Sequence, residues 1–323
     1  MLPPYDRPYL SFAEQVDLLK QRGMTVSDDA RAARHLERIG YYRLKSYWFP
    51  FRETRTVTAP SGKPVDEVLE DFRPGSDFRH AVDLYVFDKR LRLLLTDAIE
   101  RIEVAIRVDV AHTIGRRDAW AHQNARFLDP KRAVHREPDG RTRHEAWLER
   151  ASDAENRSKA DWHGQFRRQY SSALPIWIAV ELWDFGVLSR LLEIAHPVDR
   201  YTIAQKYGIQ SSELLVSWVK TLAYVRNVCA HHGRLWNHPL VAQPMLPKGS
   251  DVPRLAHLRN HNSTQTRVYA AAAIAQHFLD VINPTSSWKV RLRALWASFP
   301  TIPGVSPAQA GFLQNWGAAA LWQ

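Results

Sequence analysis

Residues 77–114 carry one continuous helical pattern, and this stretch constrains the fold most strongly. Apolar side chains recur along it mostly three and four residues apart, as on the buried face of a helix, at Phe78, Val82, Tyr85, Leu91, Leu95, Ile99, Ile102 and Ile106. No glycine or proline interrupts the stretch, so it predicts one long helix or two joined by a bend. Glu103 and Arg107 lie four residues apart and can pair on its surface.

The remainder of the chain also favours helices. Ser11 and Glu14 form a capping-box pattern at the start of a helix predicted over 9–22. Further helices are predicted over 29–39, 144–170, 175–195 (one helix or a pair punctuated by Gly186), 198–208, 211–232 and 263–282. Proline, glycine and charge mark connections at 54–75 (a loop or short hairpin), 128–143 and 238–262.

These patterns together predict an all-α protein in three parts. We expect an N-terminal helical and aromatic-basic extension at 1–75, a helical bundle at 76–283 and a tryptophan-rich tail at 284–323. The aromatic side chains of the tail suggest that it packs onto the body of the protein.

The charge balance predicts a polyanionic partner. The net charge is +10, and arginine, which suits bidentate phosphate contacts, supplies 34 of the 44 cationic side chains. Nucleic acid is the first expectation. An anionic membrane is disfavoured because no basic amphipathic helix with a bulky exposed apolar face stands out. The alternative is that these arginines merely solvate the surface of the protein.

Several classes of site are not indicated by the sequence. The single cysteine, Cys229, excludes an internal disulfide and a cysteine-based zinc site. No Gly-rich phosphate loop, dinucleotide fingerprint or His-Glu-x-x-His motif is present, so we expect no cofactor and no metal. His231, His232 and His238 lack a carboxylate or cysteine to complete a metal site. Without a visible signal peptide or long apolar run, we expect a cytoplasmic protein.

Residues 214–237 combine a helix with the most reactive side chains of the chain. An apolar stripe runs through Leu215, Trp218, Leu222, Val225 and Cys229. At about 100° per residue, Arg226, Asn227 and His231 lie away from this stripe, whereas His232 returns to it. Gly233 then marks the helix end, where the helix dipole favours a protonated imidazole.

Two other segments carry candidate RNA-binding residues. Residues 41–52 include Tyr42, Arg43 and Lys45, which can stack bases and bind phosphates, or the segment can form a buried aromatic hub. The basic loop at 128–143 can clamp RNA or be a plain solvated loop. Arg107 and His112 repeat the Arg226/His231 spacing without the adjacent Asn, and a structural ion pair of Arg107 is the simpler interpretation.

Four separated blocks, spread over residues 5–282, resemble one family. They are YLSFAEQVDLLKQRGM with RHLERIGYYRLKSYWFPFR, then LYVFDKRLR with AIERIEVAIR, then Pro175-x-Trp177 with Glu181 and Phe185-Gly186, and finally RNVCAHHGRLWN. They resemble the Abi family of abortive-infection (bacteriophage-resistance) proteins of the AbiD/AbiF type. That family in turn resembles HEPN-type ribonucleases, whose motif is Arg, a polar residue, a few residues and then His.

The resemblance implies a fold, an activity and a set of site residues. The fold would be a HEPN-like bundle, and the protein would be a toxin-like, metal-independent endoribonuclease that acts as a homodimer. An inhibitory RNA or a protein antitoxin could hold it in check. The implied catalytic residues are Arg226, Asn227, His231 and His232, supported by Arg234, Trp236, Asn237, Glu103 and Arg107.

The chemistry of RNA cleavage gives these residues roles. His231 fits the acid/base, Arg226 the phosphate clamp, and Asn227 a group that orients the imidazole or binds a phosphate oxygen. His232 can support the fold or face a second subunit, while Arg234, Trp236 and Asn237 can hold the loop or contact RNA. Two alternatives stay open: a non-catalytic RNA-binding module, and a capped helix whose polar residues only knit the following loop.

Overall fold

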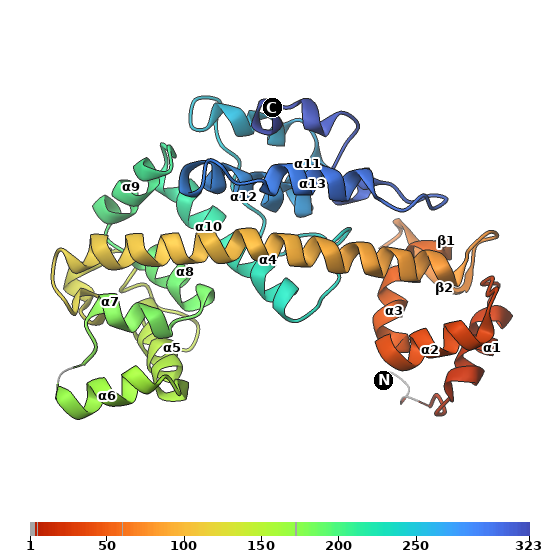
Figure 1. The fold of residues 1–323 in the computed structure, drawn as a ribbon, viewed down its shortest axis with the longest axis horizontal. Coiled ribbons are helices and arrows are strands. Elements are labelled where there is room, and N and C mark those ends of the chain that lie inside the picture. Colours follow the sequence, from red (N-terminus) through yellow and green to blue (C-terminus); the bar gives the residue numbers. More distant parts are fainter. Residues whose placement is uncertain (1–3, 5, 60, 172) are drawn as a thin grey trace. The chain divides into compact units, whose positions relative to one another are not determined.

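The computed structural model describes all residues except 1–3, 5, 60 and 172. These residues pack into two compact units, each of which is described by itself. One contains the chain up to Leu91 together with Ala294–Pro307, and the other contains Arg92–Arg293 together with Ala308–Gln323. Helices dominate both units (Figure 1), which confirms the all-α prediction. The three predicted domain ranges stay a prediction.

The first unit contains three short helices and a hairpin. Its elements are α1 (Phe12–Gln21), α2 (Asp29–Ile39), α3 (Tyr41–Trp48), a 3-10 turn (Phe49–Phe51), β1 (Arg52–Thr58), β2 (Pro64–Phe72) and the first part of α4 (Phe78–Gly115). The predicted capping box is present, because Ser11 and Glu14 exchange side-chain to backbone hydrogen bonds. Strands β1 and β2 pair antiparallel, so the predicted loop or hairpin is a hairpin.

The aromatic-basic segment 41–52 contains both buried and exposed side chains. Tyr47, Trp48 and Phe51 are buried, and the Tyr47 hydroxyl donates a hydrogen bond of 2.7 Å to Asp88 Oδ2. Tyr42 is 66% exposed, and Lys45 Nζ lies 5.8 Å from the centroid of its ring. The aromatic hub is therefore real, while Tyr42 with Lys45 faces solvent.

The second unit contains the remaining helices. Its elements are the rest of α4, α5 (Arg143–Arg157), α6 (Asp161–Gln169), α7 (Ile176–Ala179), α8 (Phe185–Ile194), α9 (Pro197–Lys206), α10 (Ser212–Ala230), α11 (Asn262–Thr266), α12 (Val268–Ile282) and most of α13 (Trp288–Ala297), with 3-10 turns at Ala121–Gln123, Ala125–Phe127, Val180–Leu182, Pro253–Arg259, Pro307–Ala310, Trp316–Ala318 and Ala320–Trp322. Helix α4 is continuous from Phe78 to Gly115, which decides between the one-helix and two-helix predictions.

Three predicted helices are divided differently in the structure. Residues 144–170 form α5 and α6, because Ser158 takes an extended conformation after α5. In the 175–195 stretch the break lies before Gly186, since the Asp184 side chain accepts from the Val187 amide and starts α8 there. Residues 263–282 form α11 and α12, separated by an extended Arg267.

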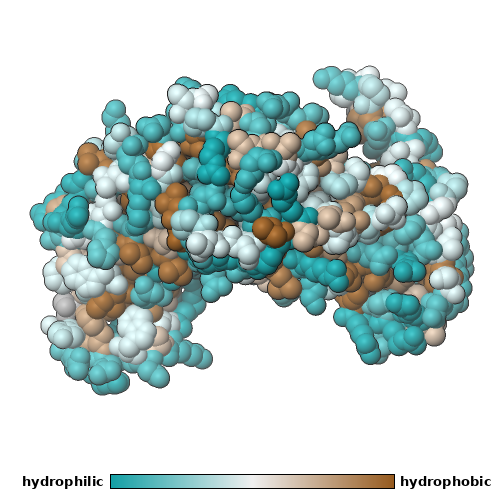
Figure 2. Space-filling view, turned by 45° about the horizontal axis from the view of Figure 1, so that its top comes forward, coloured by the Kyte–Doolittle hydropathy of each residue, from teal (hydrophilic) through white to brown (hydrophobic). Residues whose placement is uncertain are grey.

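The tail packs onto the second unit through its tryptophans, as predicted. Trp288 is fully buried and its indole N–H donates to the Leu94 carbonyl at 2.7 Å. The buried Trp322 indole N–H likewise donates to the Tyr269 hydroxyl at 3.0 Å. Across the described part of the chain, no helix combines the length and hydropathy that crossing a membrane would require. On the face in Figure 2, hydrophilic residues predominate and hydrophobic residues form small separate groups.

A buried aromatic cluster fastens α5 to the segment before α8. The His122 ring lies 6.1 Å from the Trp147 ring and 5.5 Å from the Trp183 ring, between centroids. His122 is 2% exposed. Burial, reinforced by the neighbouring His144, lowers the pKa of His122 to about 4.

We expect His122 to make the protein sensitive to acid. The unfolded chain takes up a proton on this side chain near its ordinary pKa of 6.5, before the folded chain does, so stability is lost as the pH falls from that value toward 4. The loss is on the order of 2–3 kcal/mol, at about 1.4 kcal/mol per pKa unit. Urea unfolding near pH 7 and near pH 4.5 should show a smaller loss for His122→Phe than for the natural protein; equal losses would contradict this assignment.

Candidate functional site

Helix α10 is positioned by the burial of one face. Its predicted apolar stripe, Leu215, Trp218, Leu222, Val225 and Cys229, is buried along the full length of the helix. In the second unit α10 packs against α8, α9 and α12 (Figure 1). The rotation of the helix about its axis is therefore fixed, and Arg226 and Asn227 are held on the side away from the stripe.

The helix ends earlier than predicted, and this changes the position of His232. The last helical residue is Ala230, with His231 as the cap. His232 has a φ of 56°, its amide donates to the Cys229 carbonyl at 3.1 Å, and the Gly233 amide donates to the Val228 carbonyl at 2.9 Å. These are the two bonds of a Schellman motif. The prediction that His232 returns to the apolar stripe is wrong, because the helix has already ended and the residue is exposed.

Gly233 has a steric role rather than the predicted conformational one. A Cβ atom at this position would lie 3.1 Å from Val228 Cγ1, so a side chain would disturb the close approach of the loop to the helix. The Gly233 carbonyl accepts a hydrogen bond of 3.1 Å from Arg92 Nη1, whose side chain is largely buried on α4. The end of α10 is thereby tied to α4.

One largely buried carboxylate, that of Glu103, contacts two arginines. One of them, Arg226, belongs to the group Arg226, Asn227 and His231, which we call the motif. Glu103 on α4 binds Arg107 Nη2 through Oε1 at 3.0 Å, which confirms the predicted pair. Its other oxygen, Oε2, lies 3.8 Å from Arg226 Nε. The Glu103 side chain is 12% exposed and that of Arg226 is 37% exposed, so the motif arginine is partly anchored and partly open to solvent.

Burial and the neighbouring arginines have opposite effects on the pKa of Glu103. Burial raises the pKa of Glu103 above its usual range, while the positive charges of Arg107 and Arg226 act in the other direction. Arg107 is further held by the Trp183 carbonyl, which accepts from Nη2 at 2.9 Å, and by Glu181 at 3.7 Å. Arg107 is therefore committed to structural contacts, whereas Arg226 makes one long contact with Glu103 and one with the Asn227 amide oxygen at 3.4 Å.

The other predicted site residues on α10 are exposed, and those that follow the helix contact the loop after it. Asn227 and His231 are exposed, and the His231 ring makes no hydrogen bond to the residues that the structure describes. Trp236 is fully buried, so of its two predicted roles it takes that of holding the loop. The Asn237 carbonyl accepts from Arg267 Nη1, and Arg234 is half-buried nearby in sequence.

Other predicted residues belong to the first compact unit or lie on helix α4. Tyr42, Arg43 and Lys45 belong to the first compact unit. His112 is exposed on α4, and Arg107 makes its contacts with Glu103, Glu181 and the Trp183 carbonyl, as the structural interpretation of that pair predicts. Among the described residues, no three histidine, cysteine or carboxylate side chains are grouped as metal ligands.

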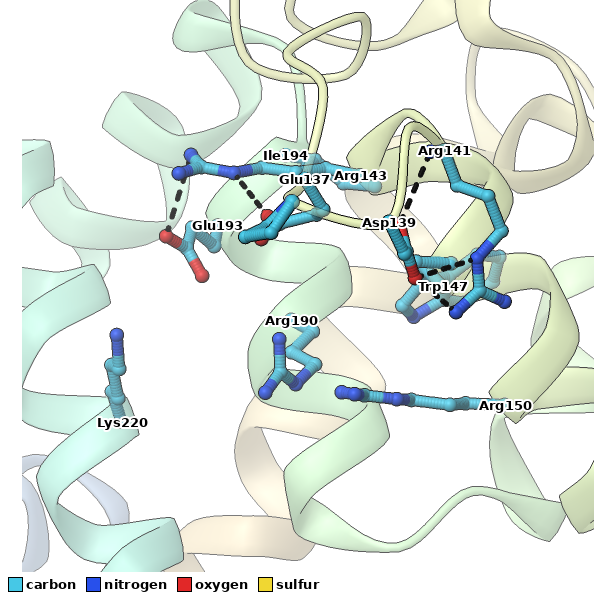
Figure 3. Close-up of a pocket in the computed structure, with 12 residues that line it drawn as sticks. Glu137, Asp139, Arg141, Arg143, Trp147, Arg150, Arg190, Glu193, Ile194 and Lys220 are labelled. Atoms are coloured by element: carbon cyan, nitrogen blue, oxygen red, sulfur yellow. Dashed lines mark hydrogen bonds and ion pairs between the residues drawn. The ribbon is translucent and has the colours of Figure 1, made fainter.

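The structure contains a hollow lined by basic side chains that we did not predict from the sequence. Arg150 on α5, Arg190 on α8 and Lys220 on α10 extend into one hollow of about 450 Å³ (Figure 3). One signal was present in the sequence: Arg143, Arg150 and Arg157 recur every seven residues, which places them on one side of a helix. The loop at 128–142 is fastened beside it, since Asp129 pairs with the buried Arg200 at 3.0 Å.

The fold and site define a mostly helical protein. Arg226, Asn227 and His231 lie at the solvent-accessible C-terminal end of a helix whose other face is buried. The model of the family described as Abi-like protein matches residues 34–237, which is more than half of the chain and includes the whole motif. The chain belongs to this family, and membership supports a function in resistance to bacteriophage. No curated protein and no solved structure matches the chain.

The left-handed backbone conformation of His232 should affect the free energy of unfolding of variants at this position. His232→Gly should leave the free energy of unfolding unchanged or raise it by up to ~1 kcal/mol, because glycine adopts this conformation without strain. His232→Val should lower it by about 1–2 kcal/mol, because a β-branched side chain is strained there. Thermal and urea unfolding of the two variants would check this, and a valine variant as stable as the glycine variant would refute it.

Proposed function

We propose that this protein is a metal-independent endoribonuclease of the HEPN type that acts in phage defence. The observation that carries the proposal is the arrangement at the end of α10: Arg226, Asn227 and His231 are accessible at the end of a helix that is otherwise firmly packed. Family membership supports the role in phage defence, and the net charge of +10 supports a nucleic-acid target.

The proposed reaction is attack by an RNA 2′-hydroxyl on the adjacent phosphorus. The 2′-oxygen forms a bond to phosphorus as a base removes its proton, and the bond to the 5′-oxygen breaks as an acid protonates that oxygen. The products are a 2′,3′-cyclic phosphate and a 5′-hydroxyl. His231 would exchange a proton at one of these oxygens, and Arg226 would stabilise the negative charge that develops on the phosphoryl oxygens.

Glu103 would position Arg226 for this role. A carboxylate 3.8 Å from Nε restricts the arginine side chain while leaving its terminal nitrogens available to a phosphate. The motif supplies two exposed histidines, His231 at the cap of α10 and His232 immediately after it. A homodimer that brings two such helix ends together would supply an acid and a base from different subunits, and an inhibitory RNA or a protein antitoxin would regulate the dimer.

A non-catalytic RNA-binding module is the second candidate. The observation that favours it is that the His231 ring has no hydrogen-bond partner among the described residues, so nothing there orients it as a general base. In this case the Arg226 group would only grip phosphate.

Cleavage of a labelled, mixed RNA pool in EDTA separates these functions. Under the proposal the natural protein cuts the pool, and His231→Ala reduces the rate at least ~100-fold, the usual contribution of acid–base catalysis. His112→Ala is the matched control, since His112 is also exposed and also follows an arginine by five positions. Cutting by the His231 variant at the natural rate would place the chemistry elsewhere. RNA binding without cutting by any of the three proteins would favour the binding module.

The positioning role of Glu103 predicts a loss in turnover rather than in affinity. Glu103→Gln keeps the size and an acceptor oxygen but removes the charge that attracts Arg226. We expect kcat to fall about tenfold with KM nearly unchanged, because the phosphate clamp is less restricted while RNA contacts elsewhere remain. Cleavage kinetics at a temperature well below the melting point of the variant would measure this. An unchanged kcat would remove Glu103 from the mechanism.

A further inference from the structure

Four hollows in the second unit follow one another beside α5 and share lining residues. Consecutive hollows share lining residues: the first and second share Arg157 and Asp184, the second and third share Arg150 and Arg190, and the third and fourth share Arg143, Glu193 and Lys220. Helix α5 forms one wall along its length, and α8 and α10 contribute the other side. We call this feature the α5 groove.

The cations of the α5 groove fall into two groups. Arg141 pairs with Asp139 and Glu149, and Arg143 pairs with Glu137 at 2.9 Å, so these two are compensated within the protein. The remaining four form no ion pair or hydrogen bond with any residue that the structure describes: Arg150, Arg157, Arg190 and Lys220. Their charge is available to an external anion.

Two of these uncompensated arginines share one confined space. Arg150 and Arg190 line the same two hollows, and Figure 3 shows both side chains extending into open space without a contact to an acidic partner. Burial lowers the pKa of Arg190, and the positive charge of Arg150 adds to the effect. The negative charges of Glu193 and Glu137 act on Arg190 in the opposite direction. A phosphate group is an anion that two arginines of one hollow can bind together.

The spacing of the arginines matches an extended ligand. Arg150 and Arg157 lie seven residues apart, so they are about 10 Å apart along the axis of α5 at 1.5 Å per residue. This is the length of about three stacked nucleotides at 3.4 Å each. A compact anion would occupy one hollow and leave the rest of the α5 groove unused.

One end of the α5 groove has an aromatic side chain and a link to the motif. Trp162 lines the first hollow and is 40% exposed, so its ring is available for stacking. Glu181 lines the same hollow and lies 3.7 Å from Arg107, which shares Glu103 with Arg226. A base stacks on such a ring only when it is unpaired, which favours a single strand over a duplex.

We propose that the α5 groove binds a single strand of RNA and leads it to the Arg226 motif. Phosphates would contact Arg150, Arg157, Arg190 and Lys220, and an unpaired base would stack on Trp162. The choice of RNA over another polyanion rests on the proposed function. The groove itself rests on geometry and charge, so binding and cleavage are tested separately.

The test is RNA binding in a His231→Ala background, in which cleavage cannot distort the titration. Fluorescence anisotropy with a labelled 12-nucleotide single-stranded RNA would compare Arg150→Gln/Arg190→Gln with the control Arg116→Gln/Lys248→Gln. The control pair is exposed, lies outside these hollows and removes the same charge. A loss of two phosphate contacts should reduce the slope of log K against log salt by ~1.4 and weaken binding ~25-fold at 0.1 M salt, if the affinities converge at 1 M.

The aromatic end has its own matched pair. Trp162→Ala should weaken binding of the 12-nucleotide strand about tenfold. Trp177→Ala should not, because Trp177 lies outside the groove although it is 52% exposed. A duplex of the same sequence should bind less tightly and should be insensitive to the Trp162 change.

Three results would overturn the proposal. The first is equal weakening by the groove pair and the control pair, which would mean that overall charge alone binds RNA. The second is duplex binding as tight as that of the single strand. The third is unchanged RNA affinity of the groove pair with loss of polyglutamate binding, which would assign the groove to an acidic protein segment. An inactive protein that passes the binding tests would refute the proposed nuclease and leave the groove assignment in place.

Discussion

The burial of one complete face of α10 is the constraint on which the functional end of this protein depends. Five apolar side chains from Leu215 to Cys229 fix the rotation of the helix, and the Schellman motif after Ala230 fixes where it stops. Arg92 then ties the capped end to α4. Because the helix can neither rotate nor extend, Arg226, Asn227 and His231 are presented to solvent in a defined order. The burial of the apolar face of α10 therefore keeps the three motif side chains in position.

Ion pairs also hold the end of α10 in place within the second unit. Glu103 is kept in a largely buried position by Arg107, and it restrains Arg226 from the side opposite to solvent. The α5 groove carries four further cations that form no ion pair with any described side chain. Cations without ion-pair partners suit a surface that binds a polyanion, as we propose for this groove.

The sequence predicted the elements better than it predicted their ends and their cavities. Apolar periodicity defines a continuous α4 and the buried stripe of α10, because both depend on local spacing. The position of His232 was missed because a helical projection assumes that the helix continues, whereas backbone hydrogen bonds end it at Ala230. The α5 groove could not be predicted as a cavity, since α5, α8 and α10 approach one another only in the fold, although the seven-residue spacing of its arginines is visible in the sequence.

The central claim is that the Arg226 motif cleaves RNA through the 2′-hydroxyl and without a metal. The most direct measurement compares two strands of one sequence in EDTA, one of ordinary RNA and one methylated at every 2′-oxygen. The account predicts that the ordinary strand is cut to fragments with 2′,3′-cyclic phosphate ends and that the methylated strand binds but stays intact. Equal cleavage of both strands, or cleavage of either that requires added Mg²⁺, would contradict it.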